Sequence, residues 1–204
     1  MKTKSASDWD ERYRESETGL FGDAPNEYLR MVCARHGFMP QTALLPADGD
    51  GRNGTWLAGR DMDVTAFDLS PEATRLAQAR DTAAGVSVER FCADVMDWQP
   101  EAGRRWEAVM IFYLHGPTVL RQTAMEKAMA ALAPGGWLVL EGFAKAAEPS
   151  SGPRDSEARY NLSELERWAN GLEIVELMAG KLLLDEGSRH QGLANVARLI
   201  ARVR

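Results

Sequence analysis

The sequence predicts an α/β fold: a mostly parallel, doubly wound sheet with helices on both faces. Segments of helical periodicity alternate with short apolar runs at 43–45, 64–68, 86–92, 106–113 and 137–143. A glycine turn, Gly49-x-Gly51-x-x-Gly54, directly follows the first run. The second run ends in Asp68, where an acid can accept hydrogen bonds from both ribose hydroxyls of a nucleotide-like cofactor. Strand, glycine turn, helix, strand and acid together predict a cofactor-binding sheet.

Composition fits one globular domain. The 204 residues are 26% charged and 45% hydrophobic, with a net charge of −6, which argues against nucleic acid as a partner. No apolar run approaches roughly 18 residues, so we expect no membrane span. Cys33 and Cys92 lie in apolar segments and are expected to be buried thiols of a cytoplasmic protein. The histidines His36, His115 and His190 are far apart in sequence, so we expect no metal site.

The first predicted helix is amphipathic and covers residues 7–14. Ser7 or Asp8 would cap it. Trp9 and Tyr13 are four residues apart and therefore share one helix face. They either pack this helix onto the body or form an aromatic lid over the cofactor.

The later helices carry start and stop signals. Asn26 is predicted to cap the second helix, which Gly37 ends, with His36 at its exposed end. Ser70 caps a helix with proline at its first position, and Gly85 stops that helix. Further helices are expected at 52–58 and 117–132. A short helix is expected to begin at a capping box formed by Ser163 and Glu166 and to end at Trp168.

The pattern changes after the fifth apolar run. Residues 144–159 form a polar loop. Two strand-like runs follow, at 172–184 and 194–203, and the connection 185–192 is too short for a helix, so the two runs should pair as an antiparallel hairpin. We therefore expect a single domain over residues 1–204, with an N-terminal helical lid at 1–38, a cofactor-binding core at 39–143, and a loop, helix and hairpin at 144–204.

These motifs resemble those of class I S-adenosylmethionine-dependent methyltransferases. The stretch 132–138, L-A-P-G-G-W-L, is similar to the L-x-P-G-G-x-L that precedes that family's fifth strand, and 49–53 is similar to its G-x-G-R-N loop. Trp9-x-x-x-Tyr13 resembles the aromatic pair that opens the small tellurite-resistance and thiopurine methyltransferases. The resemblance runs from Trp9 to the C-terminus and implies a Rossmann-like sheet of order 3-2-1-4-5-7-6, with strand 7 antiparallel.

The resemblance implies S-adenosylmethionine as cofactor and places its contacts residue by residue. From the methionine part through ribose and adenine to the methyl group, they are Ala47, Asp48, Gly49, Gly51, Asn53, Asp68, Leu69, Asp94, Val95, Phe112 and Tyr113, with Trp9 and Tyr13 closing over them. The chain departs from the family at Leu45, where an acid is usual, and at Ala47, where the first glycine is usual. The group that holds the cofactor's amino group is therefore left open.

Three side chains are candidates for acting on a small-molecule acceptor. Methyl transfer depends mainly on alignment, and a base is needed only when the nucleophile arrives protonated. His115 follows the fourth strand, Tyr160 follows the polar loop, and His190 lies in the connection 185–192. Each could instead satisfy only its own loop. We expect a monomer or weak homodimer.

Two alternatives stay open from the sequence. A nicotinamide-dependent oxidoreductase would use the same glycine turn, but it leaves the Pro134-Gly135-Gly136 turn and the final hairpin unexplained. A non-catalytic adenosylmethionine-binding protein would account for the departures at Leu45 and Ala47.

Overall fold

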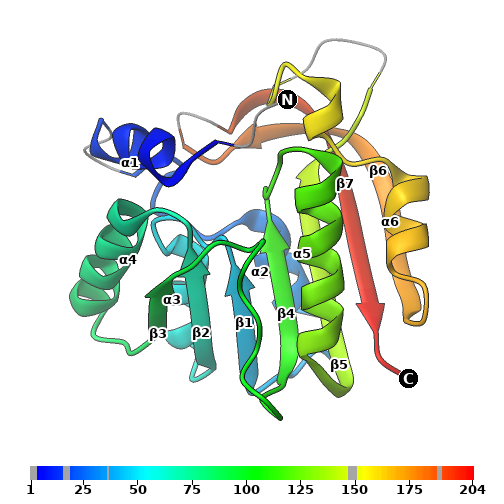
Figure 1. Ribbon diagram of the computed structural model, residues 1–204, viewed down its shortest axis with the longest axis horizontal. Helices are drawn as coiled ribbons and strands as arrows, with labels where there is room; N and C mark the ends of the chain where they lie inside the picture. The colour runs from blue at the N-terminus through cyan, green and yellow to red at the C-terminus, as the bar shows by residue number, and fades with distance from the viewer. Residues whose placement is uncertain (1–3, 16–18, 36, 147–150, 188–189) are drawn as a thin grey trace.

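The predicted sheet is present in the computed structural model, which describes residues 4–15, 19–35, 37–146, 151–187 and 190–204. The prediction for His36 lies outside these ranges. The sheet has the order β3-β2-β1-β4-β5-β7-β6 (Figure 1). β7 runs antiparallel to β5 and β6, and the other pairs are parallel. The fold class and strand order are therefore confirmed. The strands are β1 (Thr42–Pro46), β2 (Asp63–Asp68), β3 (Glu89–Cys92), β4 (Trp106–Phe112), β5 (Leu132–Phe143), β6 (Glu173–Asp185) and β7 (Gln191–Arg202).

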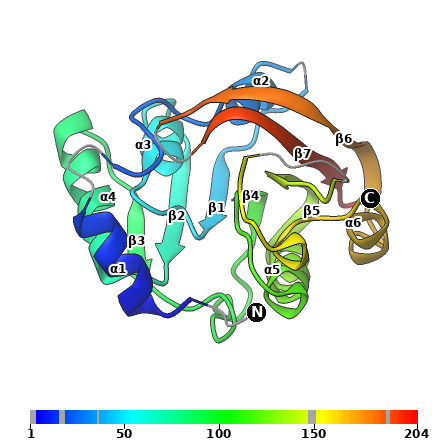
Figure 2. The ribbon, with the colours of Figure 1, turned by 90° about the horizontal axis from the view of Figure 1, so that it is seen from above.

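Helices cover both faces of the sheet (Figure 2). Neighbouring residues of β4 point to opposite faces: Ile111 packs with α5 and α6, whereas Met110 packs with α2 and α3. Burial on both faces explains why the central strands read as continuous apolar runs. α1 packs on α4, at the carboxyl ends of the parallel strands (Figure 1). The helices are α1 (Ala6–Arg14), α2 (Glu27–Cys33), α3 (Arg52–Ala58), α4 (Pro71–Ala84), α5 (Thr118–Ala131), α6 (Leu162–Trp168) and the short η1 (Ser156–Ala158).

Two predicted helix starts are wrong by a few residues. The cap of α1 is Ser5, whose hydroxyl accepts from the Asp8 N–H while the Asp8 carboxylate accepts from the Ser5 N–H. α6 is capped by Asn161, and Ser163 lies inside its first turn with its N–H donating to Asn161 Oδ1. In both cases a better-placed cap stands slightly upstream of the predicted one.

Other element boundaries also differ from the predictions. α2 ends at Cys33 rather than near Gly37, because the chain leaves it through a tighter turn from the Arg35 N–H to the Val32 carbonyl. β3 is shorter than predicted and begins at Glu89. β5 begins at Leu132, so the proline-glycine-glycine turn is taken within a strand whose register against β4 shifts there.

The connection between β6 and β7 is shorter than predicted. Asp185 pairs with Gln191, so the turn comprises only residues 186–190 rather than the eight from 185 to 192. Two long strands carry this turn over the sheet and against the segment at Phe21 and Gly22 (Figure 2). His190 therefore lies at the carboxyl end of the sheet because the two strands of the hairpin are long enough to reach it.

The cysteine prediction is wrong for Cys92. Cys92 ends β3, the edge strand, and is exposed, while Cys33 is half-buried. Within the described ranges no group of metal-ligating side chains is present, and no helix there is long and apolar enough to cross a membrane.

Candidate functional site

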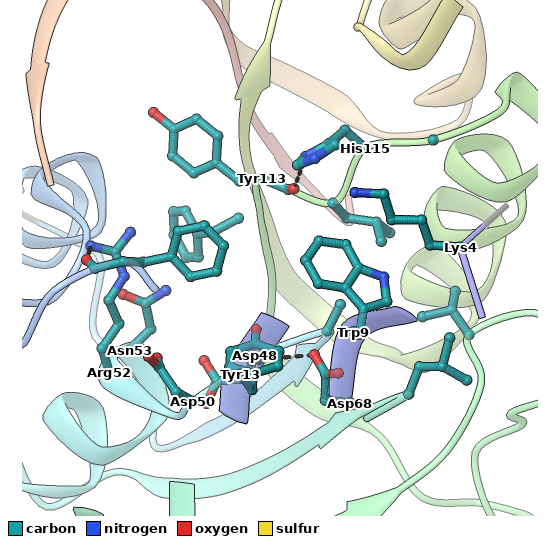
Figure 3. A pocket seen from close by; sticks show the side chains of 18 of the residues that line it. Lys4, Trp9, Tyr13, Asp48, Asp50, Arg52, Asn53, Asp68, Tyr113 and His115 are labelled. Atoms are coloured by element: carbon teal, nitrogen blue, oxygen red, sulfur yellow. Dashed lines mark hydrogen bonds between the residues drawn. The ribbon is translucent and has the colours of Figure 1, made fainter. Parts of the chain in front are cut away.

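A pocket opens at the carboxyl ends of β1, β2 and β4 (Figure 3). Its carboxylate end holds Asp48, Asp50 and Asp68 beside Tyr13, and its other end holds Tyr113 and His115 (Figure 3). Apart from Gly51 and Tyr160, every predicted site residue lines it. The lining residues are Lys4, Trp9, Tyr13, Phe21, Ala47, Asp48, Gly49, Asp50, Arg52, Asn53, Asp68, Leu69, Asp94, Val95, Phe112, Tyr113, Leu114, His115, Gly116, Leu120 and His190.

The glycine loop depends on left-handed backbone. Ala47, Gly49 and Gly51 have φ of 57°, 60° and 85°. A Cβ on Gly49 would come within 2.6 Å of the Tyr13 hydroxyl. A Cβ on Gly51 would instead meet Ala77 of α4 at 2.6 Å. The expected cofactor contact at Gly51 is therefore corrected, because this glycine allows close helix packing and does not line the pocket.

Asp68 ends β2 with a carboxylate that still has acceptor capacity. Its Oδ2 accepts from the Gly49 N–H and its Oδ1 from the Ser70 N–H, both at 2.9 Å. Each oxygen can accept a second hydrogen bond, as a pair of ribose hydroxyls requires. Burial raises the Asp68 pKa to about 6, and the two N–H donors oppose that rise.

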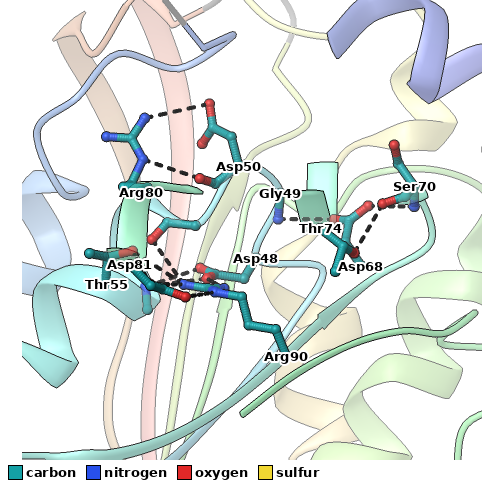
Figure 4. A network of polar contacts seen from close by, with 12 residues as sticks. Asp48, Gly49, Asp50, Thr55, Asp68, Ser70, Thr74, Arg80, Asp81 and Arg90 are labelled. Atoms are coloured by element: carbon teal, nitrogen blue, oxygen red, sulfur yellow. Dashed lines mark hydrogen bonds and ion pairs between the residues drawn. The ribbon is translucent and has the colours of Figure 1, made fainter. Parts of the chain in front are cut away.

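The Asp48 carboxylate is used within the protein (Figure 4). Arg90 Nη1 lies 2.8 Å from Asp48 Oδ2, and Arg90 Nε lies 2.5 Å from Asp81 Oδ2. The Gly54 N–H also donates to Asp48. Burial raises the Asp48 pKa, and Arg90 opposes the rise. This network connects the glycine loop to β3 and α4. Asp48 lines the pocket, but its carboxylate stabilises the protein itself.

The far end of the pocket is built from aromatic rings around His190. The ring centroid of His190 lies 4.0 Å from that of Tyr113, 4.6 Å from Phe21 and 5.4 Å from Phe143. Within the described chain, the buried His190 Nδ1 and Tyr113 hydroxyl make no hydrogen bond of good geometry, although the Glu141 carboxylate lies near enough to Tyr113 to add to the rise in its pKa that burial causes. Burial, with help from Arg52, lowers the His190 pKa to about 3, so the ring is neutral near pH 7.

Backbone geometry places the Tyr113 ring. Tyr113 has a φ of 53°, a conformation that costs a non-glycine residue about 1–3 kcal/mol and is concentrated at functional sites. Its N–H donates to the Glu141 carbonyl of β5 at 2.7 Å. Burial raises the Tyr113 pKa, so its hydroxyl stays protonated.

His115 is a second neutral imidazole, and its tautomer is defined. Its Nδ1 lies 2.5 Å from the Tyr113 carbonyl oxygen, which can only accept, so Nδ1 carries the proton. Burial lowers the His115 pKa to about 4. The Nε2 of His115 therefore presents a lone pair, as a hydrogen-bond acceptor or base does.

Tyr160 is not brought into the pocket. Its hydroxyl donates to the Leu114 carbonyl at 2.7 Å, and its buried ring lies beneath the Arg121 guanidinium at 5.0 Å. The catalytic prediction for Tyr160 is corrected on this geometry: the side chain fixes the loop that carries His115.

The residues expected around the adenine also line the pocket. They are Leu69, Asp94 and Val95, and the lid candidates Trp9 and Tyr13 line it with them. The Met96 N–H donates to Asp94 Oδ1 at 2.8 Å, which leaves Oδ2 for a ligand. The ring centroids of Trp9 and Tyr13 are 6.2 Å apart, and Tyr13 is almost fully buried. Asn53 lies deeper, and its Oδ1 accepts from the Asn26 N–H at 2.8 Å.

Seven lining residues were not predicted as site residues: Lys4, Phe21, Asp50, Arg52, Leu114, Gly116 and Leu120. Three of them bear on the chemistry of the pocket. Asp50 stands between two glycines at a position where the motif allows any residue. Arg52 was quoted in the loop without a role, and Phe21 lies in a segment without periodicity. For Asp50 one signal existed: an acid in the loop of a chain that has no acid at the end of β1.

Sequence comparison identifies the core of the chain. The profile described as a methyltransferase domain matches residues 46–136, which run from the end of β1 to the proline-glycine-glycine turn. None of the curated protein sequences matches the chain.

Solved structures of the same fold span most of the chain. TehB from Haemophilus influenzae is 13% identical with a TM-score of 0.73, over 88% of this chain and 62% of TehB. The N-methyltransferase NodS from Bradyrhizobium japonicum WM9, in complex with S-adenosyl-L-homocysteine, is 16% identical with a TM-score of 0.73, over 98% and 99%. A third structure of this fold is 19% identical with a TM-score of 0.73, over 97% of this chain and 92% of its own. It is described under the conversion of a disulfide bond into a thioacetal group during echinomycin biosynthesis. These structures share the fold of this chain, and the methyltransferase profile over residues 46–136 favours the methyltransferase interpretation over the nicotinamide-dependent one.

Proposed function

We propose that this chain is a class I S-adenosylmethionine-dependent methyltransferase and that its methyl acceptor is a small molecule bound beside Tyr113 and His190. The observation that carries the proposal is the pair of buried polar atoms, His190 Nδ1 and the Tyr113 hydroxyl, that have no partner in the described chain. Leaving a buried polar atom unsatisfied costs about 1–3 kcal/mol. A ligand with its own donor and acceptor would recover that cost.

The residues of the carboxylate end fit the cofactor. Asp68 offers two oxygens to the ribose hydroxyls, and Gly49 leaves no room for a Cβ beside Tyr13. When bound, S-adenosylmethionine supplies a methyl group on a positively charged sulfur. Phe112 and Tyr113 both line the pocket, and an aromatic face within roughly 6 Å favours a cation. These residues support the order of contacts that the sequence motifs imply.

The residues of the aromatic end suit a neutral or soft nucleophile. His190 and His115 are both uncharged near pH 7, so the pocket meets the acceptor with hydrogen bonds and apolar surface. The Nε2 lone pair of His115 can take a proton from an acceptor that arrives protonated. Two relatives by fold are named as an N-methyltransferase and as a magnesium protoporphyrin IX methyltransferase. Those names support the small-molecule class and leave the acceptor atom open.

The experiment has two steps. First, purified protein and S-adenosylmethionine are incubated with thiols, selenium and tellurium anions, and small phenols, and release of S-adenosylhomocysteine is measured. Second, His190→Ala is compared with Gln191→Ala, an exposed neighbour next to the same turn, on the best acceptor. His190→Ala should lower turnover by roughly 10²–10⁴ with cofactor affinity and melting temperature nearly fixed, as loss of an acid–base or orienting group does.

Turnover by His190→Ala within about threefold of the parent would contradict the role of His190 and would move the acceptor to His115. The cytoplasmic location, the monomeric or weakly dimeric state and the division into lid, core and hairpin stay predictions.

A further inference from the structure

We infer that Asp50 is the counter-ion of the cofactor's α-ammonium group, taking the place of the acid that the end of β1 lacks. The inference rests on the proposed binding of S-adenosylmethionine in this pocket. It concerns a residue that the glycine-loop motif itself leaves unassigned.

The Asp50 carboxylate is buried and makes no hydrogen bond of good geometry within the described chain. The side chain is only 2% exposed and lines the pocket. Neither of its oxygens has a hydrogen-bond partner among the described residues. A buried carboxylate without a partner is unfavourable, and it persists where a ligand supplies the missing charge.

Arg80, the nearest cation, forms only a long ion pair with Asp50, whose Oδ2 lies 4.0 Å from Arg80 Nη2 (Figure 4). The other Arg80 nitrogens donate elsewhere, Nε to the Asp50 carbonyl at 3.1 Å and Nη1 to Asp23 at 3.1 Å. Burial raises the Asp50 pKa, and the charges of Arg80 and Arg52 oppose that rise, so the two arginines compensate the carboxylate in part. A cationic group in the pocket would add a close contact that neither guanidinium makes in the described chain.

The position of Asp50 in the pocket also fits this role. Asp50 lies at the same end of the pocket as Asp48, Asp68 and Tyr13 (Figure 3). Asp48 is paired with Arg90 and Asp68 accepts from two N–H groups, whereas the Asp50 carboxylate has the 4.0 Å contact with Arg80 and no closer partner in the described chain. Leu45 is buried in the apolar cluster of α2 and α3 and cannot supply the charge.

An ammonium group on the acceptor is the competing occupant. The acceptor site proposed above lies at the opposite end, where the rings of Tyr113 and His190 meet. The cofactor's amino acid part is expected along the glycine loop, beside Asp50. Geometry therefore favours the cofactor, and the ligands used in the test separate the two.

The test compares three ligands by calorimetry: S-adenosylhomocysteine, its N-acetyl derivative, and 5′-methylthioadenosine, which lacks the amino acid part. Asp50→Asn keeps the side-chain shape and removes the charge. Asp23→Asn is the matched control, because Asp23 contacts the same arginine but is exposed. We expect Asp50→Asn to weaken S-adenosylhomocysteine at least about tenfold, and to leave the other two ligands within about twofold, because one charge-assisted contact is worth about a decade.

A second readout separates binding from a structural role. Because Asp50→Asn replaces a buried charge that only a long ion pair compensates, it should keep the melting temperature of the unliganded protein or raise it by about 2–4 °C. If Asp50→Asn weakened all three ligands equally, or left the affinity for S-adenosylhomocysteine unchanged, the inference about Asp50 would be overturned. Binding of S-adenosylhomocysteine to the parent protein would still support the cofactor assignment. No binding of S-adenosylhomocysteine to the parent would overturn the cofactor assignment and this inference together.

Discussion

At the scale of single residues, Asp68 carries the largest share of the proposed cofactor affinity. Its two oxygens would each take a charge-assisted hydrogen bond from the ribose, worth about 1.5–3 kcal/mol apiece. Asp68→Ala should therefore weaken S-adenosylhomocysteine binding at least about tenfold, measured by calorimetry. Asp63→Ala, at the exposed start of the same strand, is the control. Unchanged affinity in a folded Asp68→Ala protein would remove Asp68 from the site.

The pKa of Asp68 makes cofactor binding depend on pH. Burial raises this pKa from 3.8 to about 6, so the folded protein holds the proton more tightly than the unfolded chain. The stability that protonated Asp68 contributes is therefore lost as the pH rises from 3.8 through 6.

Binding should respond to pH in the opposite direction, because the charged carboxylate is the acceptor. S-adenosylhomocysteine affinity should be about tenfold lower at pH 5 than at pH 7.5, one decade per pH unit below the pKa. Burial also raises the pKa of Asp50, which adds to the same trend. Calorimetry at the two pH values checks this, and equal affinities would show that neither carboxylate binds in its charged form.

Positions in the pocket lining were predictable from the sequence where a motif assigns them. Asp68, Asp94 and Tyr113 stand at fixed positions after strands, and they line the pocket as expected. Asp50 and Phe21 could not be assigned in this way, because their positions depend on how distant segments fold over the loop. Tyr160 was misjudged because its sequence position does not reveal that its hydroxyl bonds the Leu114 carbonyl.

At the scale of elements, α1 contributes Trp9 and Tyr13 to the pocket lining, and we predict that it closes over the cofactor as a lid. It is a nine-residue helix with one fully buried side chain, Tyr13, and it packs mainly on α4. A short terminal helix of this kind is marginal on its own. S-adenosylhomocysteine should therefore slow hydrogen exchange at its amides, measured by mass spectrometry. Equal exchange with and without the ligand would favour plain packing, and α6, remote from the pocket, serves as the reference.

A buried ion pair joins the hairpin turn to the glycine loop. Arg52 Nη2 lies 2.6 Å from Glu186 Oε2, and both side chains are largely buried. Arg52 Nη1 also donates to the carbonyls of Phe21 and Ala24, and Glu186 accepts from the Glu27 N–H. One pair therefore holds three segments that are far apart in the sequence.

Breaking this pair should cost more stability than breaking an exposed one. Glu186→Ala leaves Arg52 buried without its partner, a change that costs about 3–5 kcal/mol. Arg30→Ala, which breaks a pair with Glu27 that is exposed on both sides, should cost less than about 1 kcal/mol. Urea unfolding of both variants measures the difference, and equal losses would mean that the hairpin turn is held by packing alone.

At the scale of the whole molecule, the sheet and its helices were predictable because local signals agreed with one another. Apolar runs, the Ser70 cap and the glycine at 85 each describe a short segment, and β2 and α4 formed where they indicated. The hairpin turn was harder, since strand length rather than turn residues decides where β6 and β7 end. The proposed acceptor end of the pocket could therefore not be predicted from local sequence patterns, because a hairpin, a loop and the N-terminal segment meet there.

The most direct test of the account is calorimetric titration of the parent protein with S-adenosylhomocysteine, with a nicotinamide dinucleotide as the control ligand. We predict saturable one-to-one binding of S-adenosylhomocysteine, a melting temperature that rises with its concentration, and no binding of the dinucleotide. Binding of the nicotinamide dinucleotide, or of neither ligand, would contradict the assignment of this pocket to S-adenosylmethionine.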